Sequence, residues 1–535
     1  MLWAVALGCN AAPSPAPNRR GGGSASGGTV GSVGAGGTLA AGGSVATGSP
    51  PGSENSPTTR KTITLGALPD TNVDVLFVLM DWAGDPESQR KLYDQIPLFL
   101  NELKMPTAAL DLHIAVVTAD MGVSGDTSGA TSCTPHGDDG AFQSRPRGAC
   151  TDSTLSAGAT FLADDGRGTT NFSGAIADVL QCIFPPGNDG CGFPQPLAAA
   201  EHALGADNVT GGVPTPPAGN AGFLRPDAAL AIVFLANQDD CSAPAGTPLY
   251  ALDGAQSLEN PLGPLQNYRC NQFGHLCRDP SSGELVTPPL DPPPDAQGTM
   301  TAPVLDLANC QDDEQQTGLL TPVSQFVADI RALKADPDDR ILVAAIVAPT
   351  SPYSVAWVPA GAASTVPGEL WPEIEHSCGA AGGDDVNPAA AMTPTDGSFG
   401  DPAVRLAQFV GAFPQSVLAS ICNASYAPAA ETIAAKIAAL PQSQNCLTGQ
   451  LQRDSYGQPT CAVTATVANA AGATLTVPYP NCTENENIVP CWTLTDGTGT
   501  CGGQSFVFRD LPGQPTEEVT ATCSFCRPGV PAPGC

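Results

Sequence analysis

The side chains best suited to acid–base catalysis or zinc binding are the five histidines, and they are scattered along the chain. None has the His-Glu-x-x-His spacing that would place two metal ligands on one face of a helix. A Gly-x-Ser-x-Gly motif and a P-loop are also absent, and no Gly-x-Gly-x-x-Gly stands between a strand and a helix as a dinucleotide-binding fingerprint would. We therefore expect no catalytic centre and no enzymatic activity. The histidines are His113, His136, His202, His275 and His376.

Two glycine-bordered segments carry paired carboxylates, at residues 136–140 (HGDDG) and 163–166 (ADDG). Carboxylate oxygens in a loop can coordinate Ca²⁺. Asp-Gly is also ordinary turn chemistry, in which the carboxylate bonds to nearby backbone N–H groups. The sequence leaves both readings open, so we predict no cofactor but keep Ca²⁺ or Mg²⁺ as possible ions.

The cysteine content points to an oxidising compartment. The chain has 19 cysteines against 6 methionines, a usage that a reducing cytosol rarely tolerates. Cys523 and Cys526 form a Cys-x-x-Cys pair that stands alone, so zinc-site spacing is lacking. If Cys9 is set aside, the remaining 18 can all pair, but sequence does not give their connectivity. We expect a disulfide-stapled, extracytoplasmic protein.

Charge narrows the possible partners. The 21 basic and 52 acidic residues give a formal net charge of −31. Such a field repels nucleic-acid phosphates and anionic lipid headgroups. We expect no nucleic-acid binding, and contact with a membrane only through an N-terminal lipid.

The start of the chain resembles a lipobox. The sequence contains no apolar run long enough for a spanning helix, but residues 5–9 (VALGC) place a small residue before Cys9, which would then be acylated. The match departs from the pattern because Ala6 stands where Leu is usual and the basic start of a signal peptide is missing. The alternative is a stray cysteine in an ordinary secretory signal. We predict a lipid-anchored protein of the bacterial outer membrane or cell surface.

Composition divides the chain into four parts. Residues 1–9 are predicted to be the signal peptide with its lipobox. Residues 10–71 are rich in Gly, Ser and Pro and are predicted to be a flexible tether. Residues 72–441 have the texture of a large α/β domain. Residues 442–535 are predicted to be a small β-rich domain held by up to four bridges. Its cysteines are Cys446, Cys461, Cys482, Cys491, Cys501, Cys523, Cys526 and Cys535.

The α/β domain is predicted from alternating strands and helices. Continuous apolar, β-branched runs, typical of strands covered on both faces, occur at 73–80, 112–118, 229–235, 341–347 and 417–422. Helical patterns lie between or after them, at 87–104, 196–204, 323–334 and 427–440. Such alternation implies right-handed crossovers and a doubly wound, mostly parallel sheet of the Rossmann-like kind. Long insertions, which we expect to be disulfide-stapled, fall at 121–169, 242–316 and 349–401.

Several segments carry a family resemblance. Residues 73–78 (VDVLFV) followed by 87–89, then 111–117, 190–197 (GCGFPQPL) and 223–227 leading to 239–242 (DDCS), are similar to von Willebrand factor A-type (vWA) domains. More specifically, the chain resembles large cysteine-rich vWA lipoproteins of the myxobacterial kind. The resemblance implies a vWA fold and a metal-ion-dependent adhesion site at the carboxyl ends of the strands.

In that family, an Asp-x-Ser-x-Ser loop, a Thr and an Asp from three loops hold Mg²⁺, and a ligand carboxylate completes the octahedron. Matching the first strand to the family puts Met80, Trp82 and Gly84 where the Asp and the two Ser belong. Asp81 is displaced by one residue, which reverses its direction at a strand end. The first loop therefore departs from the metal-binding pattern.

The second and third loops depart as well. Asn188 or Asp189 replaces the expected Thr, and Asn237 replaces the anionic Asp. Because Mg²⁺ demands near-ideal octahedral geometry, we predict a degenerate adhesion site that binds it weakly or not at all. An alternative is a looser, calcium-like site built from Asp81, Asp85, Asp239 and Asp240.

The same apex supplies candidate contact residues for a ligand: Trp82, Asn188, Asp189 and Asn237. An exposed aromatic such as Trp82 at a binding apex can be a contact residue, and packing on a neighbouring loop is the alternative. The leading functional hypothesis is a tethered adhesion module for an extracellular or envelope protein or polysaccharide. One rival is a structural envelope protein without a specific ligand. Another is a carboxylate-based hydrolase, which would need two carboxylates facing each other across a cleft.

Overall fold

The computed structural model describes most of the chain after residue 57. The described residues are 58–65, 72–81, 86–104, 109–123, 133–147, 150, 155–184, 187, 190–210, 213–251, 256–293, 303–315, 318–360, 363–379, 399–440, 446–447, 450–468, 474–482, 491–496, 504–509, 518–527, 531 and 533–535. The predicted signal peptide and Cys9 lie outside them, as do Trp82, Asp85, Asn188 and Asp189.

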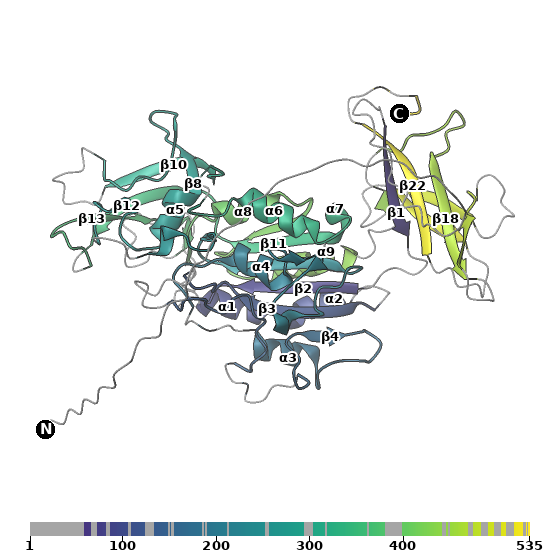
Figure 1. Cartoon of the computed structure of the whole chain (residues 1–535), viewed down its shortest axis with the longest axis horizontal. Helices are drawn as coiled ribbons and strands as arrows, with labels where there is room; N and C mark the ends of the chain where they lie inside the picture. Colours follow the sequence, from purple (N-terminus) through teal and green to yellow (C-terminus); the bar gives the residue numbers. More distant parts are fainter. Residues whose placement is uncertain are drawn as a thin grey trace, which may run out of the picture. The chain divides into compact units, whose positions relative to one another are not determined.

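A six-stranded sheet in the order β16-β11-β7-β2-β3-β4 forms the centre of the α/β region (Figure 1). Its first five strands run parallel, and β4 pairs antiparallel with β3 at one edge. The five strands predicted from apolar runs are these parallel strands, so that prediction is confirmed. The bounds are β2 (Asn72–Leu79), β3 (Asp111–Thr118), β4 (Leu162–Asp164), β7 (Ala229–Ala236), β11 (Ile341–Val347) and β16 (Gln415–Ser420).

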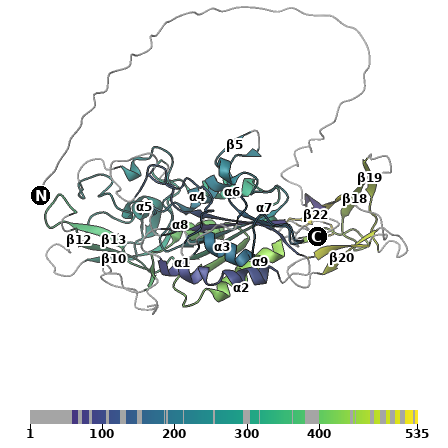
Figure 2. The same ribbon diagram turned by 90° about the horizontal axis from the view of Figure 1, so that it is seen from below.

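Helices cover both faces of this sheet. Alternate residues of a strand point to opposite faces, and Val75 and Phe77 of β2 therefore join one apolar cluster while Leu76 and Val78 join another. The first cluster includes α2 (Ile96–Leu103), α3 (Ile176–Ile183) and α9 (Ala427–Ala439). The second includes α4 (Pro196–Leu204), α6 (Val323–Ala332) and α8 (Val404–Gly411). Figure 2 shows α2 and α9 on one side of the sheet and α4 and α6 on the other.

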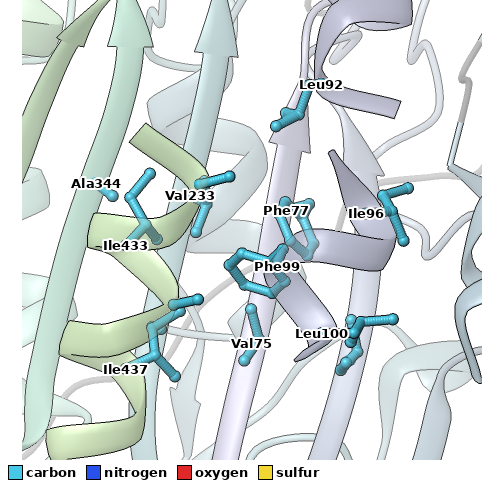
Figure 3. Close-up of a cluster of buried hydrophobic side chains, with 14 of the residues drawn as sticks. Val75, Phe77, Leu92, Ile96, Phe99, Leu100, Val233, Ala344, Ile433 and Ile437 are labelled. Carbon is cyan, nitrogen blue, oxygen red and sulfur yellow. The ribbon is translucent and has the colours of Figure 1, made fainter. Parts of the chain in front are cut away.

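The first cluster shows how the helices are held. Phe99 of α2 packs edge-on against Phe77 at 5.4 Å between ring centroids, and Ile433 of α9 lies over Val233 and Ala344 (Figure 3). All of these side chains are buried. Burial of a large apolar side chain contributes about 1.5–3 kcal/mol, so these contacts hold both helices on the sheet.

The predicted helix 87–104 is divided in two. The structure has α1 (Pro86–Tyr93) and α2, separated by a turn at Asp94 and Gln95. Pro97 lies in the first turn of α2. A proline has no N–H to donate to the carbonyl four residues earlier, so it ends one helix and starts the next.

The second and third predicted insertions together form a five-stranded sheet in the order β13-β12-β10-β8-β9. Its strand pairs are antiparallel. The bounds are α5 (Tyr268–Gly274), β8 (His275–Arg278), β9 (Leu285–Val286), β10 (Val304–Asp312), β12 (Tyr353–Pro359) and β13 (Leu370–Ile374). Further short elements of the α/β region are β5 (Val209–Thr210), β6 (Val213–Pro214), α7 (Pro337–Arg340), β14 (Cys378–Gly379) and β15 (Phe399–Gly400).

The described part of the C-terminal region is β-rich and contains sheets in the orders β1-β22-β18-β19 and β17-β21-β20. The strand β1 (Thr58–Leu65) pairs along its whole length with β22, so the predicted tether 10–71 is wrong for these residues. Alternating Thr and branched apolar residues give this segment its β-propensity. The other bounds are β17 (Cys446–Leu447), β18 (Cys461–Ala468), β19 (Thr474–Pro478), β20 (Cys491–Asp496), β21 (Gln504–Arg509) and β22 (Glu518–Cys526).

Disulfides staple both regions, as predicted, and indicate an extracytoplasmic protein. Within the described part of the chain, no helix is long and apolar enough to cross a membrane. The bridges in the α/β region are Cys133–Cys191, Cys150–Cys182, Cys241–Cys270, Cys277–Cys310 and Cys378–Cys422. Those in the C-terminal region are Cys461–Cys523, Cys482–Cys491 and Cys526–Cys535.

Candidate functional site

The candidate site lies at the carboxyl edge of the parallel strands, where open α/β sheets bind their ligands. Asp239 and Asp240 follow the end of β7, next to the start of α8 and to the elements α5 and β8 of the second insertion. Both side chains are buried. Their hydrogen-bond partners determine what this edge can bind.

Asp240 has donors on both carboxylate oxygens. Its Oδ1 accepts hydrogen bonds from the backbone N–H of Leu197 at 3.0 Å and the Ser242 hydroxyl at 2.6 Å. Its Oδ2 accepts from the Ser242 N–H at 3.1 Å and from Nε and Nη2 of Arg405 at 3.2 and 3.0 Å. The carboxylate therefore joins the first turn of α4 to α8.

Both carboxylate oxygens of Asp239 also have hydrogen-bond partners inside the protein. Its Oδ2 lies 2.9 Å from Nε2 of His275 and accepts the Arg405 N–H at 2.8 Å, while its Oδ1 accepts the Leu406 N–H at 3.1 Å. Burial opposes ionisation of this carboxyl, but the hydrogen bonds from His275 and from the first turn of α8 outweigh it and hold its pKa below the usual value. On its other side, Nδ1 of His275 lies 2.7 Å from the Tyr353 hydroxyl of β12.

Arg405 carries the charge that balances these carboxylates. Its guanidinium is buried, contacts Asp240 and Asp312 through ion pairs, and donates to the Thr321 carbonyl at 2.7 Å. Burial opposes the charge, but the carboxylates outweigh it and raise the pKa of Arg405. Asp312 lies in β10, and burial raises its pKa to about 6 although Arg405 acts in the opposite direction. The network thus links the central sheet to the five-stranded sheet of the insertions.

Asp81 belongs to a different group of carboxylates. Burial, followed by repulsion from Asp120 and Asp138, raises its pKa to about 8, so it is mostly protonated at neutral pH. Its carbonyl accepts the N–H of Gly190 at 3.0 Å. A Cβ on Gly190 would lie 2.2 Å from the Asp81 carboxyl oxygen, so any larger residue there would displace the Asp81 side chain.

The residues that the structure describes do not fit a Mg²⁺ site. Asp239 and Asp240 accept hydrogen bonds from internal donors on every carboxylate oxygen, and Asp81 is mostly neutral at pH 7. Asn237, at the position where the proposed resemblance expects an Asp, is fully buried, and neither its amide nitrogen nor its oxygen has a hydrogen-bond partner among the described residues. No group of three or more His, Cys, Asp or Glu among the described residues is arranged to hold a metal ion.

The two glycine-bordered segments have the contacts of turns. Asp164 accepts the N–H of Gly166 at 2.9 Å, and Asp165 accepts those of Arg167 and Thr169, each at 2.8 Å. In the other segment, the Ala141 N–H donates to the Asp138 carbonyl at 2.9 Å and closes a turn, while the Asp138 carboxylate accepts from the Thr118 hydroxyl at 2.8 Å. These contacts favour turn chemistry over calcium coordination.

A small polar cleft lies beside Asp239, with a volume of about 10 Å³. That is room for about one water molecule. The disulfide Cys241–Cys270 forms part of its wall and ties α5 to the end of β7. Its lining residues are Pro194, Gln238, Asp239, Asp240, Cys241, Asn267, Cys270, Asn271, His275 and Asp401.

Sequence reasoning placed Asp239 and Asp240 at this edge but missed Arg405, Asp312 and His275. Their positions far away in the chain gave no local signal. The usable signal was the arginine in the apolar 402–410 segment (PAVRLAQFV), since an arginine on a buried helix face needs carboxylate partners.

No protein-family model and no curated protein matches this chain. Among solved structures, the adhesive tip pilin GBS104 of Streptococcus agalactiae is similar over 89% of this chain and 82% of its own, at 9% identity and a TM-score of 0.21. The pilus adhesin RrgA of Streptococcus pneumoniae is similar over 87% of this chain, at 10% identity and a TM-score of 0.22, and the match spans 58% of its length. TM-scores of this size establish neither a common fold nor a common function.

Proposed function

We propose that this protein is a vWA-type binding module that engages an extracellular or envelope protein or polysaccharide at the carboxyl edge of its central sheet. A parallel sheet with helices on both faces supports the vWA assignment, together with the sequence resemblance. The disulfides support a place outside the cytoplasm. At this edge the insertions gather, and loops of this kind set binding specificity on a rigid scaffold.

The observation that carries the proposal is the buried network around Arg405. Asp240 and Asp312 are both paired with its guanidinium, and Asp239 is held by His275 and the first turn of α8. The edge is therefore rigid without a metal ion. A surface that is already ordered before binding loses less entropy on association, so binding here is independent of Mg²⁺.

Anchoring completes the proposal. Acylation at Cys9 would attach the protein to the membrane, and the segment after it would hold the folded part away from the surface. Mass spectrometry of the N-terminal peptide tests this step. An unmodified Cys9 would exclude the lipid anchor without affecting the binding proposal.

Binding is tested with the purified protein on glycan arrays and against envelope extracts, with capture compared between two variants. Asn267 lines the cleft, is partly exposed and makes no capping hydrogen bond. Asn267→Trp should block the edge and reduce capture at least tenfold. The control Ala221→Trp adds the same bulk at an exposed position before β7, on the amino side of the strands, and should leave capture unchanged.

The rival functions give different results in the same assays. Equal capture by Asn267→Trp and by the control would remove the carboxyl edge as the binding site. Absence of any saturable ligand would favour a structural envelope protein. Turnover of a glycoside or another hydrolysable substrate by the purified protein would favour the hydrolase.

A further inference from the structure

His202 lies in the last turn of α4 with a carboxylate beside each of its ring nitrogens. Nδ1 is 2.7 Å from Oδ2 of Asp207, just after the helix, and Nε2 is 3.7 Å from Oδ1 of Asp139, in the loop that follows β3. A neutral imidazole carries one N–H, whereas the imidazolium carries two. The ring can therefore donate toward both carboxylates only while it is charged.

The surroundings of the ring favour this charged form. The C-terminal end of a helix carries a partial negative charge, which stabilises a cation in the last turn. The hydrogen bond to Asp207 and the charges of Asp207 and Asp139 outweigh burial and raise the pKa of His202 above its ordinary 6.5. Glu201, the neighbouring acid on α4, interacts instead with Asp329 of α6, and burial raises its pKa to about 9, so it is uncharged at neutral pH. The ring therefore keeps its charge to a higher pH than an ordinary histidine does.

The loop is held at two other points that do not involve the ring. Asn220 donates to the Gly140 carbonyl at 2.8 Å, and the Asp138 carboxylate accepts from the Thr118 hydroxyl, at the end of β3, at 2.8 Å. Asp139 stands between these points with a left-handed backbone, at φ 51°, which Asp tolerates better than most residues. Its side chain is 64% exposed, and the ion pair to the ring is the contact that orients it. The charge of the ring therefore controls the turn around Asp139.

We propose that His202 is a pH-sensitive clasp for the loop at residues 137–140, beside the carboxyl edge of the central sheet. In acid, the imidazolium holds Asp207 with one nitrogen and Asp139 with the other. When the pH rises, the ring loses one proton to water; the remaining N–H stays with Asp207, whose contact is the shorter, and Asp139 is released. Because the pKa of His202 is raised in the folded protein, the contribution of the clasp to stability is fully present below 6.5 and is lost as the pH rises through the folded pKa.

The exposure of Asp139 limits the size of the effect. An ion pair whose partner lies largely in solvent changes an equilibrium by no more than about fivefold. Release of Asp139 should therefore increase opening of the loop by up to about fivefold and leave the fold intact. The loop is tied to the end of β3 and, through Cys133–Cys191, to the segment before α4. Its order thus affects the carboxyl edge, and this consequence for binding rests on the proposed function, whereas the clasp itself does not.

The clasp is tested by NMR on the full-length protein with labelled histidine rings, titrated from about pH 5 to 9. His202 should titrate above 6.5, and the amide signals of Asp139 and Gly140 should follow the same curve. Hydrogen-exchange protection of these two amides, corrected for the intrinsic effect of pH, should fall by up to about fivefold over the titration. Titration of His202 at 6.5 or below, or amide signals that do not follow it, would overturn the proposal.

Variants assign the pH dependence to the ion pair. Asp139→Asn removes the charge at an exposed position whose backbone also suits Asn; it should lower the pKa of His202 and abolish the pH dependence of loop protection. His202→Gln cannot be charged and should keep protection low at every pH; if it does not fold, Asp139→Asn decides. His136→Gln is the matched control, because it removes an exposed histidine from the same segment and should leave the wild-type curve unchanged. A loop that still responds to pH in Asp139→Asn, or that loses its response in His136→Gln, counts against the clasp.

Capture experiments separate the clasp from the broader proposal. Wild-type protein should capture its ligand up to about fivefold better in mild acid than in mild alkali, and Asp139→Asn should capture it equally at both. If wild-type capture is independent of pH while Asn267→Trp still prevents it, the clasp does not regulate binding and the edge stands as the binding site. If no ligand is captured at any pH, the proposed function fails, and the NMR titration still decides the clasp.

Discussion

Replacing Arg405 by methionine should strongly destabilise the α/β region. The change removes the ion pairs to Asp240 and Asp312 and the hydrogen bond to the Thr321 carbonyl. The side chains of Arg405, Asp240 and Asp312 are essentially inaccessible to solvent, so the two carboxylates would remain buried without a counter-charge. Breaking a buried pair from one side costs about 3–5 kcal/mol. We expect a loss of that size in the free energy of unfolding.

The assay is urea unfolding with the disulfides intact, followed by tryptophan fluorescence, to which the buried Trp357 of the five-stranded sheet contributes. Arg331→Met is the control, because its ion pair with Asp338 is partly exposed and should contribute at most about 1 kcal/mol. If Arg405→Met lowers the free energy of unfolding by no more than Arg331→Met does, the ion pairs of Arg405 do not stabilise the carboxyl edge of the central sheet.

Two further measurements identify the cause. In an Asp240→Asn/Asp312→Asn background, Arg405→Met should cost much less, because no charge is left unpaired. The cost should also shrink in acid. Asp312 has its folded pKa raised from 3.8 to about 6, so its contribution to stability is fully present below pH 3.8 and is lost as the pH rises through about 6. A cost that is independent of pH from 4 to 8 would show that unpaired carboxylates are not its source.

Other predictions concern separate parts of the molecule. Burial, with Asp329 next in effect, raises the pKa of Glu201 to about 9; its contribution to stability is therefore lost as the pH rises from 4.5 through 9, and Glu201→Gln should flatten the pH dependence of thermal unfolding in that range. The disulfide Cys461–Cys523 joins β18 to β22 across a sequence separation of 62. Replacing both cysteines by serine should lower the free energy of unfolding of the C-terminal region by about 4 kcal/mol, measured by calorimetry. An unchanged unfolding transition would contradict this expectation. Isothermal titration should detect no micromolar binding of Mg²⁺, Mn²⁺ or Ca²⁺; such binding, abolished by Asp239→Ala, would restore a functional adhesion site.

The strands of the central sheet could be predicted because they are buried on both faces. In runs such as 341–347 (ILVAAIV), the consecutive apolar residues alone are enough to predict a buried strand, and β11 has those bounds. The five-stranded sheet was missed because its strands lie in two insertions and pair across long stretches of chain. Leu305 and Val355, for example, are partners in β10 and β12. Their pairing depends on long-range contacts and on bridges that periodicity does not reveal.

Only the position of the candidate site in the fold could be predicted from the sequence. The resemblance placed Asp239 and Asp240 at the carboxyl edge, and they lie there. The hydrogen bonds and ion pairs of these two carboxylates could not be predicted, because their partners His275 and Arg405 are distant in sequence and come close only in the folded chain. A carboxylate looks the same in sequence whether it faces a cation from solution or an internal guanidinium.

The pairing of β1 with β22 has a consequence for how the chain is made. β1 leaves the ribosome before all other strands of the described structure and β22 after them, yet the two align over eight residue pairs from Thr58–Cys526 to Leu65–Val519. The C-terminal sheet therefore closes only after β22 has been made, and the whole α/β region lies in the stretch of chain between two strands that pair with each other. A chain that stops short of β22 leaves β1 with unpaired backbone groups. Protease sensitivity of residues 58–65 would thus distinguish truncated molecules from complete ones.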